Sequence, residues 1–148
     1  MIAPPPPQPP RPSAPKANRR HMRADSLAAS FRYAFAGLGY LLWTQRNAKI
    51  HSLIGLAAVA LGILLGLDRF EWLVLTLTIA IVLAAEGINT ALEAAVDLAS
   101  PDYHPLAKIA KDVGAGTVLL TAIAAVIVGL LLFLPRLLPL ALHWLKLN

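Results

Sequence analysis

The sequence contains no cysteine and few charged residues, and both absences narrow the kind of protein it encodes. Without cysteine, the chain has neither disulfide bonds nor thiolate metal ligands. Charged residues make up 14% of the chain and hydrophobic residues 57%. A soluble domain has about 25% charged and about 45–50% apolar residues. The composition is therefore typical of a membrane protein.

Two sequence signals are also missing. The chain has no Walker A motif and no kinase-type glycine-rich loop, so a bound nucleotide would need another arrangement of residues to hold its phosphates. The N-terminal segment lacks the basic, apolar and cleavage regions of a signal peptide. We therefore do not expect a cleaved leader in this sequence.

The first 25 residues have the composition of a tail. Eight of the 12 prolines fall within the first fifteen residues. Such a segment cannot build a core, and we predict a disordered or polyproline II tail over residues 1–25. Recruitment of a proline-binding partner is the alternative role. Met22, at the end of this tail, marks an alternative start of the chain.

Basic residues gather before residue 50, where only Asp25 opposes them. They are Arg11, Lys16, Arg19, Arg20, Arg23, Arg32, Arg46 and Lys49. A basic arm can bind nucleic acid. Because apolar runs follow directly, we instead interpret the bias as the positive-inside pattern of a multi-pass protein of the inner (plasma) membrane. This interpretation places the N-terminus in the cytoplasm and predicts no nucleic acid partner.

The hydrophobic pattern predicts an all-α integral membrane protein. Residues 26–51 show helical spacing with interspersed polar residues, which is typical of an amphipathic helix on the membrane surface. Three apolar runs follow as transmembrane helices, at residues 52–67, 72–85 and 113–134. We expect Pro135 and Pro139 to break up an interfacial tail, residues 136–148, after a membrane-embedded domain of residues 26–135.

The second apolar run continues as a helix to Ala99 and carries a polar stripe. At about 100° per residue, Glu86, Asn89, Glu93 and Asp97 fall at roughly 0°, 300°, 340° and 20°. Ionisable residues near a membrane usually face a functional interior. A positive partner must come from elsewhere, either from Lys108 or Lys111 or from a divalent cation such as magnesium.

The depths of the two glutamates predict different roles. Glu86 follows about 21 Å of apolar helix, so it lies near the inner edge of the hydrocarbon, at the depth of a lipid hydroxyl. Glu93 lies about 10 Å further along, at the depth of a soluble phosphate donor. A general base for a lipid alcohol and a metal ligand near a nucleotide need this separation.

Three alternatives to this catalytic interpretation of the stripe remain. The acidic residues could simply solubilise the end of a span, and Asp97 in particular fits a structural role near a helix end. A transporter or channel subunit would use the stripe as a cation path, although residues 72–85 offer only Thr76 and Thr78 along the way. A membrane scaffold would leave the stripe without a purpose.

The same residues resemble the prokaryotic diacylglycerol kinase family, which includes undecaprenol kinases. Similarity covers roughly residues 26–135, and its most specific part runs from Glu86 to Asp112. The matching stretches are SFRYAFAGL (30–38), TQRNAKIH (44–51), EGINTALEAAVDL (86–98) and YHPLAKIAKD (103–112). The resemblance implies a homotrimeric helical bundle with three transmembrane helices and one surface helix per subunit. It also implies ATP- and Mg²⁺-dependent phosphorylation of undecaprenol or diacylglycerol, with active sites between subunits.

The resemblance also implies roles for individual residues. Glu86 looks like the general base acting on the lipid hydroxyl, and Glu93 looks like a magnesium ligand. The positions implied for nucleotide binding are Tyr33, Asn89, Asp102, Tyr103, His104, Lys111 and Asp112. Where some relatives carry a second glutamate ligand in the surface helix, this chain has Gln45. We therefore predict weak magnesium affinity, with Gln45 as a neutral ligand at most.

Overall fold

The computed structural model describes residues 26–147, so the proline-rich tail and Met22 lie outside the described part. The chain divides into two units, residues 1–34 and residues 35–148. The described part of the first unit is the beginning of helix α1 (Leu27–Thr44). There the Arg32 guanidinium carbon lies 5.3 Å from the centroid of the Tyr33 ring, a cation–π distance.

The helix expected over residues 26–51 is two helices. α1 ends at Thr44 and α2 runs from Arg46 to Leu65. Between them Gln45 has an extended backbone, with φ −89° and ψ 119°, while its carbonyl already accepts from the Lys49 amide. Neither proline nor glycine marks this break, so the helical spacing runs straight through it. Residues 46–51 therefore belong to the first spanning helix.

The turn between α2 and α3 (Arg69–Ala99) has a complete set of caps. Gly66 ends α2 in the left-handed conformation, φ 64°, which glycine adopts without steric cost. Asp68 then begins α3 with a capping box. Its side chain accepts from the Glu71 amide at 2.9 Å, and the Glu71 carboxylate accepts from the Asp68 amide at 2.8 Å.

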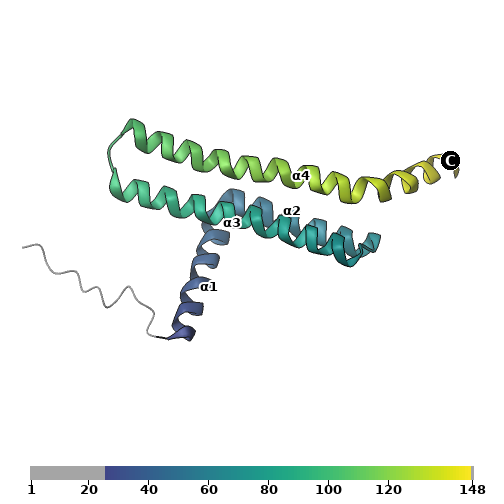
Figure 1. The fold of residues 1–148 in the computed structure, drawn as a ribbon, viewed down its shortest axis with the longest axis horizontal. Coiled ribbons are helices and arrows are strands. Elements are labelled where there is room, and N and C mark those ends of the chain that lie inside the picture. The colour runs from purple at the N-terminus through teal and green to yellow at the C-terminus, as the bar shows by residue number, and fades with distance from the viewer. Residues whose placement is uncertain (1–25, 148) are drawn as a thin grey trace, which may run out of the picture. The chain divides into compact units, whose positions relative to one another are not determined.

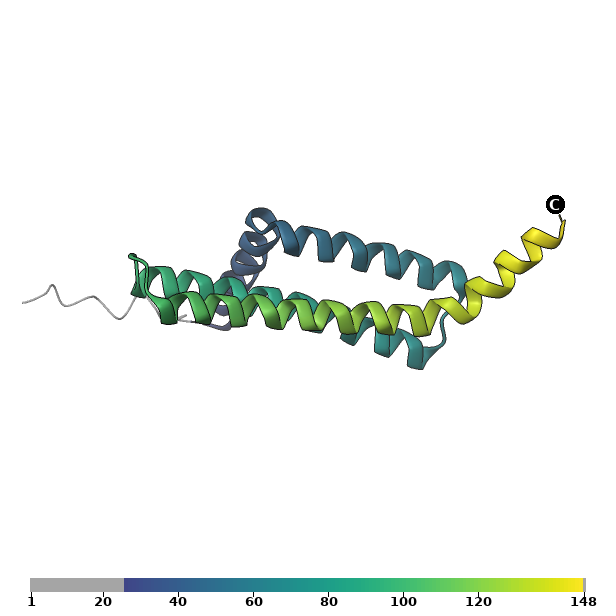
Figure 2. The same cartoon turned by 90° about the horizontal axis from the view of Figure 1, so that it is seen from above.

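α3 and α4 (Pro105–Leu147) form a long antiparallel pair, and α2 packs against both (Figures 1 and 2). Contrary to expectation, α4 continues past Pro135 and Pro139 to Leu147. The last part of α4 turns away from the rest of the helix in Figure 2. A proline without an amide hydrogen, whose ring crowds the carbonyl four residues earlier, kinks a helix in this way.

Few side chains are buried within the single chain. A small core of Leu67, Leu75, Leu132 and Phe133 lies near the α2–α3 turn. Elsewhere large apolar side chains point outward, such as Leu64 at 81% and Leu131 at 71% exposure. α2, α3 and residues Pro105–Leu140 of α4 are each long and apolar enough to cross a membrane. Within residues 26–147 the fold is all-helical, and the three predicted spanning helices are confirmed.

Candidate active site

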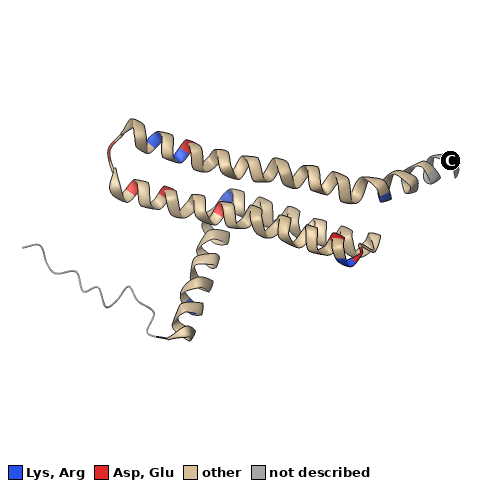
Figure 3. Cartoon of the chain, in the orientation of Figure 1, with Lys and Arg blue, Asp and Glu red and all other residues tan. Residues whose placement is uncertain are grey.

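The polar stripe of α3 lies partly inside the helix bundle. Glu86 is 2% exposed and Asn89 is 9% exposed, whereas the surrounding helix is apolar. No charged residue separates Glu71 from Glu86, a stretch of about 22 Å. Figure 3 shows one acidic position well inside α3, away from both helix ends. The prediction that one face of α3 gathers the polar residues is confirmed for these two side chains.

Glu86 faces a histidine of α2. The Nε2 atom of His51 lies 3.4 Å from Oε1 of Glu86. This carboxylate oxygen is buried and has no hydrogen-bond partner among the described residues. A buried carboxylate without full partners costs free energy, and a protonated imidazole at this distance would offset part of that cost. Among the described residues, the His51 imidazole is thus the group that lies within ion-pair distance of Glu86.

Within the stripe, Asn89 contacts Glu93, and it also lies against α4. Its side-chain nitrogen donates to Oε1 of Glu93 at 2.9 Å. Its side-chain oxygen is buried without a donor among the described residues. A Cβ atom on Gly114 of α4 would lie 2.4 Å from this oxygen and 3.0 Å from the Leu92 side chain. Glycine at position 114 therefore lets α4 approach Asn89 closely enough to enclose it.

Of the two lysines proposed to relieve the stripe, one pairs with the last residue of the stripe and the other pairs within its own helix. Lys111 reaches across from α4 to Asp97 at 2.5 Å, one turn beyond Glu93. Lys108 pairs with Asp112 of its own helix. The expectation that a lysine relieves the stripe thus holds for Asp97, and this pair also supports the structural role suggested for that residue. Neither lysine neutralises Glu86.

The loop between α3 and α4 brings its predicted site residues to the same end of the helix pair. Asp102, Tyr103 and His104 are all exposed. The Ser100 hydroxyl donates to the Asp102 carbonyl at 3.0 Å, and the His104 Nδ1 atom accepts from the Leu106 amide at 3.2 Å. His104 therefore satisfies one of the free amides at the start of α4, a structural role that the sequence pattern did not indicate.

The end of α1 within the second unit lies against α3. Leu41 is buried, and its Cδ2 atom is 3.6 Å from the place that a Cβ on Gly87 would occupy. Gln45 follows one turn later, half-buried, with its amide nitrogen donating to the Thr44 hydroxyl. Tyr33 belongs to the first unit, and the structure defines its place in α1 alone.

The donor set suits a magnesium ion that brings its own phosphate ligands. Among the described residues, no three histidine or acidic side chains gather closely enough to hold a metal. Asp97 is paired with Lys111, so Glu93 is the carboxylate that stays available on this part of the stripe. Magnesium is commonly bound by one or two carboxylates together with substrate phosphates. The residues present fit that arrangement.

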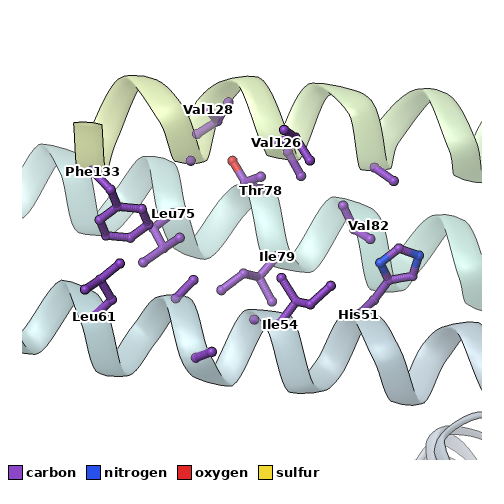
Figure 4. A pocket seen from close by; sticks show the side chains of 16 residues that line it. His51, Ile54, Leu61, Leu75, Thr78, Ile79, Val82, Val126, Val128 and Phe133 are labelled. Atoms are coloured by element: carbon purple, nitrogen blue, oxygen red, sulfur yellow. The ribbon is translucent and has the colours of Figure 1, made fainter. Parts of the chain in front are cut away.

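A groove of about 500 Å³ runs over α3 between α2 and α4. Its walls are almost entirely apolar and include Ile54 and Leu61 of α2, Ile79 of α3 and Phe133 of α4. Figure 4 shows His51 at one end of the groove and Leu61 with Phe133 at the other. Glu86 does not line the groove, although His51 does.

No pattern in the sequence predicts a role for His51. It precedes the uncharged run of residues 52–67 and lies in the stretch TQRNAKIH, for which the resemblance implies no role at this position. A polar residue at the start of an apolar run is a weak signal, because the same pattern describes any helix end at a membrane surface. Which neighbour the His51 side chain faces is known only from the packing of α2 against α3.

Comparison with known proteins gives one consistent family. A model of the family described as prokaryotic diacylglycerol kinase matches residues 32–133. A diacylglycerol kinase of Synechocystis sp. is 53% identical over 118 residues, which cover 79% of this chain and 67% of that protein. An undecaprenol kinase of Bacillus subtilis is 41% identical over 108 residues, covering 73% and 88%. A diacylglycerol kinase of Escherichia coli is 32% identical over 95 residues, covering 64% and 78%.

Proposed function

The chain belongs to the prokaryotic diacylglycerol kinase family and is a membrane-bound lipid kinase, and we propose that it transfers the γ-phosphoryl group of ATP to the hydroxyl of undecaprenol or diacylglycerol. One observation carries this proposal. The buried Glu86 carboxylate lies within the apolar part of α3, and the hydrogen-bonded pair of Asn89 and Glu93 lies further along the same helix. The apolar part meets the lipid, and the polar part meets the nucleotide.

The position of Glu86 supports its role on the lipid. Arg136 of α4 contacts Glu71 of α3, and Lys111 of α4 contacts Asp97 of α3. These two pairs show which parts of α3 and α4 lie at the same depth. Between Asp112 and Arg136, α4 has no charge over about 36 Å. Glu86, about 22 Å from Glu71, therefore falls inside this apolar band, where a lipid hydroxyl at the edge of the hydrocarbon can be reached.

The position of Glu93 supports a role at the phosphate donor. It lies about 10 Å beyond Glu86, next to the Lys111–Asp97 pair and on the side of the exposed loop. Glu93 would hold Mg²⁺ with the phosphates of ATP, and Gln45 would be a neutral ligand from the α1–α2 junction. The ion would supply charge neutralisation to the phosphoryl group. Tyr33, Asp102, Tyr103, His104 and Asp112 are the further positions proposed to contact the nucleotide.

The chemistry assigned to the chain's own residues is proton removal and charge stabilisation. Glu86 accepts the proton of the lipid hydroxyl while the hydroxyl oxygen attacks the γ-phosphorus in line with the leaving ADP. Lys111 donates to phosphate oxygens once it exchanges Asp97 for the nucleotide. Asn89 holds the Glu93 carboxylate through its 2.9 Å hydrogen bond. Substrate alignment on one rigid helix supplies the remaining part of the rate acceleration.

A cation path is not favoured by the groups along α3. The hydroxyl of Thr78 donates to the Val74 carbonyl, so it is occupied by its own helix. Beyond this hydroxyl and His51, the walls of the groove are apolar. A conducting path needs polar groups or water along its length, which these walls do not provide.

We also propose a homotrimer in the inner membrane, with the N-terminus in the cytoplasm. The exposed apolar faces of the spanning helices need lipid or neighbouring subunits to cover them. The described residues of the single chain bring no three histidine or acidic side chains together for a metal, which agrees with active sites completed by a neighbour. The surplus of basic residues before residue 50 supports the orientation.

The direct test is phosphorylation by the purified protein in lipid-containing micelles. With ATP labelled on the γ-phosphate and Mg²⁺, we expect label in undecaprenyl phosphate or phosphatidic acid, depending on the lipid supplied. Chelation of Mg²⁺ should abolish the transfer. Absence of labelled lipid with both acceptors would contradict the proposed function, whereas the ratio of the two rates would identify the preferred lipid.

A further inference from the structure

One oxygen of the Glu86 carboxylate is enclosed beside an imidazole. Oε1 is buried without a hydrogen bond among the described residues, and the Nε2 atom of His51 lies 3.4 Å from it. This distance is slightly longer than a hydrogen bond, whose usual range is about 2.7–3.2 Å. Hydrogen bonds of catalytic groups are often long in the absence of substrate and shorten in its complex. A small movement of the ring would therefore let the imidazole donate to Oε1.

The other elements packed around Glu86 bring no second charged group within ion-pair distance of it in the described part of the chain. On α4, residues 113–134 contain no ionisable side chain. Lys111 pairs with Asp97, which is about three turns further along α3. Lys49, two residues before His51 on α2, is exposed. The imidazole is therefore the group that can hold this carboxylate in place.

A general base needs a fixed orientation as well as a charge. The terminal torsion of a glutamate side chain is broad, so a carboxylate without a directional contact can turn its oxygens through many positions. The apolar neighbours of Glu86 on α3 offer no such contact to its oxygens. A misplacement of about 1 Å in a reacting group can cost about 100-fold in rate. Catalytic side chains are accordingly held by hydrogen bonds from the residues behind them.

We propose that His51 is a positioning residue, which donates from Nε2 to Oε1 of Glu86 and so directs the other carboxylate oxygen, Oε2, at the lipid hydroxyl. This inference rests on the proposed function, in which Glu86 accepts the hydroxyl proton. A base oriented by a third group is a common arrangement in enzymes. A neutral imidazole with its proton on Nε2 suffices for this role. The donated hydrogen bond also stabilises the charged form that the base must have before the reaction.

The ring of His51 also covers one side of the carboxylate. The imidazole lines the end of the apolar groove, whereas Glu86 does not line it (Figure 4). The side chain of Glu86 is 3% exposed, against 20% for that of His51. A hydroxyl or water molecule in the groove would therefore meet the ring before it met Oε1. This arrangement leaves Oε2 as the oxygen that takes the proton.

The imidazole keeps its own proton through the reaction. The lipid O–H bond breaks, and its proton moves to Oε2 of Glu86. The hydroxyl oxygen forms a bond to the γ-phosphorus while the bond from that phosphorus to the ADP oxygen breaks. After release of the lipid phosphate, the carboxyl group returns the proton to water, with Oε1 still beside Nε2. His51 thus changes the rate of the step without taking part in its bonds.

The test compares two amide replacements of His51 in the full-length protein. In His51→Gln the amide nitrogen lies near the place of Nε2, so a donor to Oε1 remains. In His51→Asn the side chain is one methylene shorter, and its amide lies near the place of Nδ1, away from Oε1. We expect kcat within about threefold of the natural protein for His51→Gln and a fall of about 10–100-fold for His51→Asn. KM for ATP and lipid should change less than about threefold in both, because the contact acts on Glu86 rather than on either substrate.

Ser52→Ala is the matched control, because Ser52 is the next residue on α2 and its hydroxyl has no hydrogen-bond partner among the described residues. It should keep normal kcat. Circular dichroism and thermal unfolding in detergent separate loss of the reaction from loss of the fold. If His51→Asn does not fold, His51→Leu gives the same comparison, because leucine also lacks a donor.

Two results would overturn the proposal. One is a folded His51→Gln variant as slow as the variant without a donor at this place, since the donor would then not be the cause. The other is a folded variant without the donor whose kcat stays within about threefold of the natural protein.

A double-mutant cycle gives a second, independent result. In the Glu86→Gln protein, His51→Asn should lower the residual rate less than about threefold, because no carboxylate is left to orient. Two losses that multiply would show that His51 acts independently of Glu86 and would also overturn the proposal. The proposed function fails on a different observation, namely an unaltered protein that phosphorylates neither lipid.

Discussion

Polar side chains occur toward both ends of the helix bundle, but they have partners to different extents. At the α2–α3 turn, Asp68 and Glu71 share a capping box, and Arg136 binds the Glu71 carboxylate with two nitrogens at 2.5 and 2.8 Å. In the half of α3 that leads to the other end, Glu86 and Asn89 each have a buried oxygen without a hydrogen-bond partner among the described residues. The Asp68 and Glu71 carboxylates are thus fully partnered at the turn, whereas the Glu86 and Asn89 oxygens are incompletely partnered.

This difference separates structural polar groups from functional ones. At the turn, the capping box and Arg136 occupy the Asp68 and Glu71 carboxylates, so neither carboxylate is left for a ligand. A buried oxygen without a donor costs free energy that the fold alone does not return. Within an apolar helix, such groups are typically retained because a substrate, proton or ion uses them. The predictions below test this division.

The largest effect is expected for Glu86→Gln. This replacement keeps the volume and polarity of the side chain but removes the carboxylate that accepts the proton of the lipid hydroxyl. We expect kcat to fall at least about 100-fold, within the range that general acid–base catalysis contributes. Binding of ATP should persist, because the nucleotide residues lie further along α3 and in the loop. Initial rates at saturating lipid and a nucleotide-binding titration measure the two quantities.

Glu71→Gln is the matched control at the paired end, because it makes the same chemical change on the same helix. It weakens the interaction with Arg136 and should lower the thermal unfolding temperature while leaving kcat unchanged at lower temperature. The division between the ends would be wrong if Glu71→Gln reduced kcat as strongly as Glu86→Gln.

A smaller effect is expected for Gly114→Ala. The added methyl group would meet the Asn89 oxygen at 2.4 Å, so either Asn89 or α4 must move. Because Asn89 holds Glu93, we expect activity to fall about 10-fold and the free energy of unfolding to fall by about 1–3 kcal/mol, as for other overpacked sites. Steady-state kinetics and thermal unfolding in detergent give both values.

Gly116→Ala is the matched control two residues later on α4. Apart from its own stretch of α4, no atom of the described residues lies within 4 Å of the added Cβ there, and alanine favours a helix over glycine by about 0.5–1 kcal/mol. Stability should therefore hold or rise, with unchanged activity. Equal losses in the two variants would mean that close packing at Asn89 is not the cause.

The spanning helices were predictable, and the partners of the site residues were not. Apolar runs identify α2, α3 and α4 because the membrane requires length and hydropathy, which composition records directly. The stripe of Glu86 and Asn89 followed from helical spacing alone. The break at Gln45 and the contact of His51 with Glu86 depend on packing between helices, which spacing along one helix does not encode. Proline at 135 predicts a bend reliably but not a helix end.

A moderate effect on the magnesium dependence of activity is expected for Gln45→Glu, which adds a charge. Gln45→Glu would add a carboxylate at the α1–α2 junction, where this chain has a neutral amide. If Gln45 lies near the bound magnesium, half-maximal activity should need several-fold less Mg²⁺, because carboxylates are the stronger ligands. A titration of activity with Mg²⁺ at fixed ATP measures this. An unchanged magnesium dependence would remove Gln45 from the metal site.

The smallest effect on activity is expected at the capping box, which begins α3 and has no role in the proposed reaction. Asp68→Ala removes the oxygen that accepts from the Glu71 amide, and loss of such an N-cap costs about 1 kcal/mol of unfolding free energy. Asp68→Asn keeps a capping oxygen and should unfold close to the natural temperature. Neither variant should change kcat, since about 22 Å of helix separates this turn from Glu86. A loss of kcat in folded Asp68→Ala would show that the turn communicates with the site and that the two ends are not independent.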